Sequence, residues 1–188
     1  REPASFVEYY PTLDNWFDVQ AYPNDHDGIA IYFRDITERK EREQARQRAE
    51  KRYQKLLELA PVPIVAVDPR TGELPEANEA AGDLIGCPTA ELIGRTRVSL
   101  HPSEKSDGYD AIFKNAREQG GSWRRLPDGS PTCIVTEHGE KTPVEITTKK
   151  VTLQGEDIIY EILQDISDQL EYQHWVDTLN EATHELFN

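Results

Sequence analysis

Two stretches near opposite ends of the chain share one pattern of apolar and polar positions. Residues 29–34 and 159–164 carry mostly apolar residues in a strand-like order, which predicts a β-strand in both places. The first stretch runs into Asp-Ile-Thr at Asp35 and the second into Asp-Ile-Ser at Asp165, and a charged segment of helical composition follows each. The spacing of 130 residues (165 − 35) exceeds the roughly 20–50 residues of solenoid repeats. It suits one whole domain plus a connecting helix.

Residues 1–37 carry the pattern of a β-hairpin. Residues 16–22 have the aromatic and β-branched side chains that favour strands. The turn signal of residues 23–28 ends at Gly28, which can take a left-handed conformation, and residues 29–36 form the return strand. Because an isolated hairpin is marginally stable in water, this one is expected to pack on a neighbouring domain, pair with a second chain or stay mobile.

Residues 38–59 have the composition of a helix that stops before Pro61. Small and apolar residues recur in this segment at intervals of 4, 4, 3 and 4 residues, the spacing of a narrow coiled-coil seam. The seam consists of Ala45, Ala49, Tyr53, Leu56 and Ala60. It predicts a homodimer through parallel helices, and the alternative is a solvated spacer helix.

Residues 60–167 combine short strands with short helices, which predicts one complete α+β domain. Asn78 is placed as the N-cap of a short helix that Gly86 ends, and Gly94 ends a second helical turn. A longer helix is expected over residues 104–119. Strands are expected at residues 63–68, 74–77, 132–137 and 143–151, and after the turn at residues 154–156.

Residues 122–131 interrupt this order with Trp123, Arg124, Arg125 and two prolines. One interpretation is a surface insertion that Trp123 anchors. The other is a contact site for a partner, because exposed Trp and Arg are enriched at binding hot spots.

The order of these elements, with Asn78 opening the first helix and Leu-Ile-Gly sequences ending at Gly86 and Gly94, resembles a PAS domain, the small sensor module of signalling proteins. The Asp-Ile-Thr and Asp-Ile-Ser junctions resemble the point where such a domain exits into a signalling helix. The resemblance implies an α+β PAS fold: a five-stranded antiparallel sheet with short helices on one face, flanked by N- and C-terminal signalling helices. The insertion at residues 122–131 departs from the family pattern, which usually runs straight into its third strand.

The resemblance also divides the chain into parts. Residues 1–37 are expected to be the C-terminal hairpin remnant of a preceding PAS domain, so that two PAS domains stand in tandem. Residues 38–59 correspond to the connecting signalling helix and residues 60–167 to the complete PAS domain. The chain begins at Arg1, in what this division makes the middle of a domain, and is expected to be a piece of a longer protein.

Residues 168–188 are expected to form the exit helix, with two continuations to weigh. Residues 179–186 resemble the first helix of a GAF domain in archaeal multi-domain regulators. The His184-Glu-Leu sequence instead resembles the phospho-acceptor box of histidine kinases, but Phe187 follows where that box continues with Arg. The GAF continuation is preferred, and the kinase is kept as the alternative.

The chain of 188 residues carries a formal net charge of -14, and its isoelectric point is about 4.8. Nucleic acid and anionic membranes would repel such a surface, so direct contact with either is not expected. The acidic composition also resembles that of haloarchaeal proteins. No run reaches the roughly 18 apolar residues of a membrane span, and Cys87 and Cys133 lack the spacing of a metal or disulfide motif. A reducing cytoplasm is therefore the expected location.

No catalytic constellation is present in the sequence. It contains no phosphate-binding loop, nucleophile elbow or kinase signature. His101 lies at the start of a helix, its usual place in the family without haem, and neither cysteine lies in the Asn-Cys-Arg stretch of the flavin-photochemical relatives. No enzyme activity, metal, haem or flavin adduct is expected, and the cofactor stays unknown. No metal-ligand spacing links the five histidines His26, His101, His138, His174 and His184.

These observations predict a sensor and signal-transmission module of a cytoplasmic multi-domain regulator, in signal transduction or transcription regulation. A pocket between sheet and helices would admit a small-molecule ligand or none. Ser167 is also expected to be the N-cap of the exit helix. The alternatives are the sensor region of a histidine kinase and a ligand-free dimerisation or spacer domain. The expected signal-transmission junction, where strand and helix are coupled, consists of Asp35, Thr37, Asp165 and Ser167.

Overall fold

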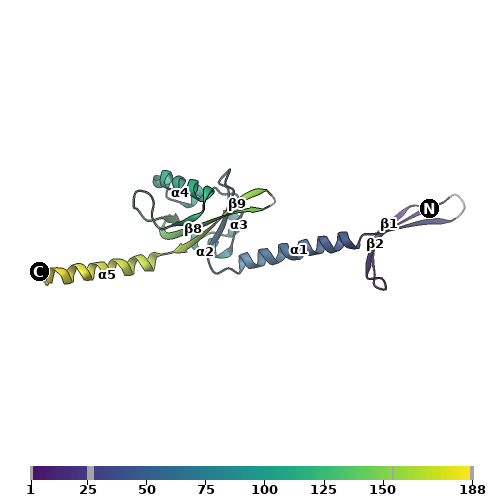
Figure 1. Ribbon diagram of the computed structural model, residues 1–188, viewed down its shortest axis with the longest axis horizontal. Coiled ribbons are helices and arrows are strands. Elements are labelled where there is room, and N and C mark those ends of the chain that lie inside the picture. The colour runs from purple at the N-terminus through teal and green to yellow at the C-terminus, as the bar shows by residue number, and fades with distance from the viewer. Residues whose placement is uncertain (1, 25–27, 154, 187–188) are drawn as a thin grey trace. The chain divides into compact units, whose positions relative to one another are not determined.

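The structure, a computed structural model, describes residues 2–24, 28–153 and 155–186 (Figure 1). The chain divides into two units, Arg1–Lys55 and Leu56–Asn188, and each has its own antiparallel sheet. Parts of two predicted turns, at residues 25–27 and at Gln154, lie outside the described residues.

The first unit contains a three-stranded sheet in the order β1-β2-β3. The predicted hairpin is formed by β2 (Asn15–Pro23) and β3 (Ile29–Asp35), and β1 (Ala4–Tyr10) adds a strand that the sequence analysis missed. Its residues include Phe, Val and Tyr, which favour strands. These side chains fall on both faces of the sheet, however, so the alternation that marks a strand is blurred.

Helix α1 (Thr37–Glu58) follows β3 directly. Its Glu, Arg, Lys, Gln and Ala residues favour a helix. The exposed ion pairs Glu38–Arg42 and Arg46–Glu50 add the small stabilisation of i,i+4 pairs. None of the residues of α1 is buried.

The second unit contains a larger antiparallel sheet in the order β5-β4-β9-β8-β6, with β7 also paired to β8. β8 and β9 form a long central hairpin, and β4 pairs with the free side of β9. The strands are β4 Ile64–Val67, β5 Glu76–Ala77, β6 Gly121–Trp123, β7 Cys133–Val135, β8 Lys141–Leu153 and β9 Glu156–Asp165.

Short helices pack on one face of this sheet, and the core lies between the two layers (Figure 1). Ile146, Ile159 and Leu163 of the sheet meet Ile85 and Tyr109 of the helices there, and all five are at most 2% exposed. The exit helix α5 (Ser167–Leu186) follows β9. The helices of the layer are α2 Glu79–Ile85, α3 Thr89–Leu92 and α4 Ser106–Glu118, with the 3₁₀ turns η1 Arg97–Leu100 and η2 Ser103–Lys105.

The predicted α+β class, with an antiparallel sheet and helices on one face, is confirmed, but the third strand of the sheet is divided. Residues 124–132 form a loop between β6 and β7, and both of these strands pair with β8. Leu126 anchors the loop: it is buried, and a Cβ added to Gly108 of α4 would lie 3.2 Å from its Cδ1. Trp123, the predicted anchor, packs against the core, while the two arginines after it are exposed.

Candidate functional site

The exit of the second sheet is fixed by one carboxylate and by backbone hydrogen bonds. Asp165 ends β9, and its Oδ1 accepts a hydrogen bond of 2.8 Å from the N–H of Ser167. The N–H of Ile166 donates to the carbonyl of Pro143 in β8 at 3.0 Å, and Ile166 is buried. The N–H of Leu170 then donates to the carbonyl of Ile166 in the first turn of α5. The start of α5 is therefore tied to the β8–β9 hairpin.

The side chain that caps α5 belongs to Asp165 rather than to Ser167. The sequence analysis expected Ser167 to be the N-cap, but the helix begins at this residue, and its N–H is the one that Asp165 accepts. The physical reason is that an Asp side chain readily accepts a hydrogen bond from the backbone two residues further on. The described partner of the Asp165 carboxylate is thus a backbone amide.

The first junction repeats these bonds with its own residues. Asp35 Oδ1 accepts from the N–H of Thr37 at 2.9 Å. The N–H of Ile36 donates to the carbonyl of Trp16 at 2.9 Å, and the N–H of Lys40 donates to the carbonyl of Ile36 at 3.0 Å. The strand, the carboxylate and the first helical turn are therefore joined in the same way at the Asp35 and Asp165 junctions.

The first junction also has bonds that the second cannot copy. The N–H of Trp16 donates to Thr37 Oγ1 at 2.8 Å, and Asn15 Nδ2 donates to Asp35 Oδ2 at 2.7 Å. The hydrogen bonds from Thr37, followed by the one from Asn15, hold the pKa of Asp35 below its usual range. Pro143 occupies the position of Trp16 in the second junction, and proline has no N–H to donate.

Asn78 ties the start of the second unit to its first helix. It is buried, and its Oδ1 accepts from the N–H of Ala81 at 3.0 Å, as the N-cap of α2. The same oxygen accepts from the N–H of Ile64 at 2.8 Å. Its Nδ2 donates to the carbonyls of Val62 at 2.8 Å and Ala60 at 3.3 Å. One side chain thus joins the segment after α1, the start of β4 and the start of α2.

Two polar side chains lie opposite each other on the inner face of the sheet. Thr148 of β8 and Glu161 of β9 are Cα partners, and their exposed fractions are 5% and 2%. Within the described ranges, neither Thr148 Oγ1 nor Glu161 Oε2 has a hydrogen-bond partner. Burying a polar atom without a partner is costly. The pair is therefore a candidate for a functional rather than a packing role.

Arg97 of η1 is a buried cation whose positive charge acts on Glu161. Its guanidinium carbon lies 4.2 Å from the centroid of the Phe113 ring, and Nη2 lies 3.3 Å from Asp110 Oδ1. Burial raises the pKa of Glu161 to about 7, although the positive charge of Arg97 acts in the opposite direction. Burial also lowers the pKa of Arg97. The Glu161 carboxyl is thus balanced between its neutral and charged forms near neutral pH.

His101 lies between η1 and η2 and stacks on Tyr109, with ring centroids 4.0 Å apart. Its Nδ1 is 2.9 Å from the carbonyl of Cys133, and because a carbonyl only accepts hydrogen bonds, Nδ1 carries the proton. Burial lowers the pKa of His101 to about 4, so the ring is neutral at pH 7. His101 therefore contributes a neutral, stacked ring to the core.

A cleft of about 800 Å³ opens where the end of α4 meets the β8–β9 turn and the turn that follows β4. Side chains of both charges line it, and Ile93 and Ile158 supply apolar surface. Glu161 and Arg97 are not part of its lining. The charged lining residues are Asp68, Arg70, Glu73, Lys114, Arg117, Glu118, Lys150, Glu156 and Asp157.

Within the described residues, no group of three His, Cys, Asp or Glu side chains is arranged to hold a metal ion. His26 and the side chain of His184 lie outside this part of the chain. None of the helices that the structure describes is long and apolar enough to cross a membrane.

The seam residues of α1 lie on exposed helix surface. Tyr53 is 42% exposed and Leu56 is 63% exposed, and Ala45 and Ala49 are exposed as well. Helix α5 likewise exposes its large apolar residues Tyr172, Trp175 and Leu179. Both helices thus carry apolar side chains that a partner could cover.

The sequence analysis missed Arg97, Thr148 and Glu161. For Glu161 a signal was present: it lies between Ile159 and Leu163 on the face that a period of two directs inward. Arg97 lies in a 3₁₀ turn, where no repeated pattern predicts the direction of its side chain.

Comparisons with known proteins agree with this geometry. The sequence profile of one family, described as PAS fold, matches residues 51–166. The PAS domain of an HTR-like protein from Haloarcula marismortui has a TM-score of 0.56 and 20% identity, over 68% of this chain and 99% of that one. A PAS domain from a two-component sensor histidine kinase has a TM-score of 0.52 and 10% identity, over 63% and 97%. For the PAS domain of a protein from Colwellia psychrerythraea the values are 0.52 and 15%, over 64% and 98%. No curated protein matches the chain.

Proposed function

Because the chain belongs to the PAS family, whose domains sense signals, we propose that its second unit is the sensor and signal-transmission module of a cytoplasmic multi-domain regulator. The module couples a small-molecule or partner signal to an output domain, in signal transduction or transcription regulation. Residues 60–167 are its complete PAS domain. Residues 38–59 are the signalling helix before it, and residues 1–37 belong to a preceding PAS domain in tandem.

The observation that carries this proposal is the position of two carboxyl groups on one strand. β9 holds Glu161 in the core, with an unpaired Oε2 among the described residues, and Asp165 at the start of α5. The two residues are roughly 13 Å apart along a strand that rises about 3.3 Å per residue. A ligand or proton that changes the environment of Glu161 therefore acts on the strand that orients the exit helix.

Arg97 is the buried cation of the helical layer whose charge acts on Glu161. Its guanidinium now lies beside Asp110 and over Phe113. An ionised Glu161 attracts this cation more strongly than a neutral one does, so the charge state of Glu161 biases the position of η1 relative to β9. In this proposal the two states of the sensor differ in how strongly Glu161 attracts Arg97.

The module works as a homodimer in this proposal. The exposed seam of α1 supports a parallel helical pair, and the exposed apolar residues of α5 support a second one after the PAS domain. A symmetric pair of helices carries a change of helix direction to the output domain in both subunits.

The output domain in this proposal is a GAF domain that begins within residues 168–188. The acidic charge is the observation that favours a haloarchaeal regulator. A histidine kinase output is the alternative. The sequence that follows Asn188 in the gene distinguishes the two continuations.

The transmission role is tested by Asp165→Asn in the full-length protein. Asn caps a helix about as well as Asp, so the melting temperature should stay nearly unchanged. If the charge of Asp165 fixes the direction of α5, a reporter of output should lose its response to the stimulus. Gln164→Asn is the matched control, one residue earlier on the exposed strand surface. Unchanged output would remove Asp165 from signal transmission, whereas lost output with a collapsed melting temperature would show a folding defect.

A ligand-free dimerisation or spacer domain is the second candidate function, and the exposed apolar residues of α1 and α5 favour it. Native mass spectrometry of the purified protein separates the two classes. A small molecule that copurifies with the wild type but is lost in Glu161→Gln supports the sensor. Dimers that carry no added mass support the spacer.

A further inference from the structure

One face of the first sheet is apolar and largely exposed. The strand register places Phe6, Val19 and Phe33 in one row across the sheet, and Ala4, Ala21 and Ile31 in the next. Phe33 is 67% exposed and Ile31 is 52% exposed. We call this surface the apolar face, and its main apolar residues are Phe6, Phe17, Val19, Ala21, Ile29, Ile31 and Phe33. Val19, in its middle, is only 7% exposed, and Ala4, Glu8 and Tyr10 of β1 lie on the same side.

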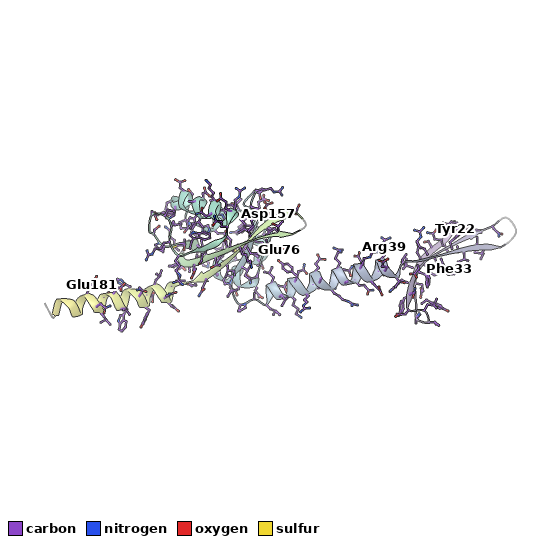
Figure 2. The ribbon with its side chains drawn as sticks, in the orientation of Figure 1. Tyr22, Phe33, Arg39, Glu76, Asp157 and Glu181 are labelled. Carbon is purple, nitrogen blue, oxygen red and sulfur yellow. The ribbon has the colours of Figure 1, made fainter. Side chains whose placement is uncertain are left out.

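The opposite face of the same sheet mixes polar and aromatic side chains. It carries Asp18, Gln20 and Arg34 beside Val7 and three tyrosines, and Trp16 lies there with the Lys40 Nζ of α1 5.3 Å from its ring centroid. Helix α1 therefore starts on this opposite face. Tyr22 lies on this face and Phe33 on the apolar face, and both are labelled in Figure 2.

The apolar face corresponds position by position to the core face of the second sheet. Phe17 pairs with Asp35 as Val144 pairs with Asp165, so the two junctions fix the alignment. Two residues further from each junction, the pair Val19–Phe33 corresponds to Ile146–Leu163. The next step aligns the pair Ala21–Ile31 with Thr148–Glu161.

The corresponding positions differ greatly in exposure. Ile146 and Leu163 are at most 2% exposed, because the helices of the second unit cover them. In that unit β4 also pairs with the free side of β9. In the described part of the first unit, β3 is instead an edge strand. The first sheet thus leaves open both an apolar face and a strand edge that the second sheet closes.

We propose that the apolar face and the edge of β3 bind a strand and helices of the same polypeptide from outside residues 1–188, equivalent to residues 64–118 of the second unit. This segment adds a strand to β3 as β4 adds to β9, and its helices cover the apolar face as α2 to α4 cover the second sheet. The inference rests on the tandem arrangement proposed above and names what completes its first domain.

A strand joined to helices fits the first sheet better than a second copy of this chain does. Two apolar faces pressed together would exclude water from both, but the backbone N–H and C=O groups along β3 would stay unpaired. An edge strand with free backbone groups is a site where another strand adds. One segment with both elements satisfies the edge and the face together.

The chemistry of the apolar face also restricts the occupant. Ile31 stands where the second unit has Glu161, and Ala21 stands where it has Thr148. The sheet therefore offers no buried carboxylate or hydroxyl at these two positions. A buried cation of the occupying segment would need an acidic partner within its own helical layer, as Arg97 has Asp110.

The experiment compares hydrogen exchange in residues 1–188 and in the same polypeptide extended upstream by its natural coding sequence. The amides of β3 should exchange at least roughly tenfold more slowly in the extended polypeptide, because strand pairing and burial protect them. Phe33→Asp should abolish this protection. Tyr32→Asp is the matched control: Tyr32 is the neighbouring residue, 62% exposed, on the opposite face.

Three results would overturn the proposal. The first is an upstream sequence that encodes no strand followed by helices. The second is equal exchange of β3 in both polypeptides. The third is a dimer of residues 1–188 that Phe33→Asp dissociates, since a second copy would then occupy the face. Each of these leaves the sensor function of the second unit standing, because that function is read from the Asp165→Asn reporter response and from protection of β8 and β9.

Discussion

The two sheets of this protein share one junction and differ in what covers their apolar faces. Asp35 and Asp165 make the same hydrogen bond to the backbone two residues on. Yet Phe33 is largely exposed while Leu163, at the corresponding position, is fully buried. The comparison teaches that a strand–carboxylate–helix junction is specified locally, whereas burial of the sheet needs a helical layer supplied by other parts of the polypeptide.

The same comparison explains why one core carries a buried carboxyl group. Glu161 sits where the first sheet has Ile31. Burial alone raises the pKa of the Glu161 carboxyl, and the charge of Arg97 opposes that shift. A polar inner position thus occurs in the core that also holds a buried cation of the helical layer, Arg97, whose ion-pair partner is Asp110.

The largest expected effect comes from truncating the two corresponding apolar residues. Leu163→Ala removes a fully buried side chain and should lower the free energy of unfolding by about 2–5 kcal/mol. Phe33→Ala removes an exposed one and should change the stability of residues 1–188 by less than about 0.5 kcal/mol. Denaturant unfolding of both variants measures the contrast, and equal losses would show that the apolar face is buried in solution.

A smaller loss of stability is expected when Asn78, the N-cap of α2, is replaced. Asn78→Ala removes the α2 cap and leaves buried backbone groups without partners, which should cost about 2–3 kcal/mol. Asn78→Asp keeps the acceptor oxygen but loses the donor to Val62 and Ala60. Its melting temperature should lie between those of wild type and Asn78→Ala. A wild-type melting curve for Asn78→Ala would contradict the joining role of this side chain.

Helix α1, which follows the first sheet, allows a test of whether the protein forms a dimer. Ala49→Asp places a charge in the α1 seam, where burial in a dimer would remove its hydration without providing a partner. The dissociation constant of the dimer should rise by at least about tenfold, which corresponds to about 1.4 kcal/mol of lost binding free energy. Sedimentation equilibrium measures the change, with Glu50→Asp, the next residue along α1, as the control. An unchanged dimer would remove the seam from the assembly.

The smallest expected effect is a dependence of stability on pH near neutrality that comes from Glu161, where the first sheet has Ile31. Burial raises the pKa of Glu161 in the folded protein to about 7 from the ordinary value of 4.5, so the folded state holds its proton more tightly than the unfolded state does. Its contribution to stability is full below pH 4.5 and is lost as the pH rises through 7. The free energy of unfolding of the wild type should fall by on the order of 1 kcal/mol between mildly acidic and mildly alkaline pH, and Glu161→Gln should abolish this fall. Urea midpoints at both pH values test this, and a wild-type slope in Glu161→Gln would assign the dependence to other groups.

Local features were predictable from the sequence. The Asp35 and Asp165 junctions follow from a strand pattern that ends in Asp and continues into a helical composition. The place of Asn78 follows from its position before a short apolar helix. Both depend on a few neighbouring residues, and such residues specify the backbone directly.

Features that depend on distant contacts were missed. β1 has apolar side chains on both faces, so it shows no clean alternation. The division of the third strand depends on the burial of Leu126 against α4, which the residues of the loop do not specify by themselves. The burial of Arg97 depends on Phe113 and Asp110, which lie further along the chain in α4. Tertiary packing, rather than local preference, decides these positions.

Pro143 makes the two junctions mechanically unequal. In the first, the N–H of Trp16 holds the Thr37 hydroxyl at the base of α1 in addition to the bonds that both junctions share. In the second, proline stands in that position and leaves the Ser167 hydroxyl without this restraint. The base of α1 is therefore held to its sheet by one hydrogen bond that the base of α5 cannot form. Restoring a backbone N–H at position 143 is the change that would make the two joints alike.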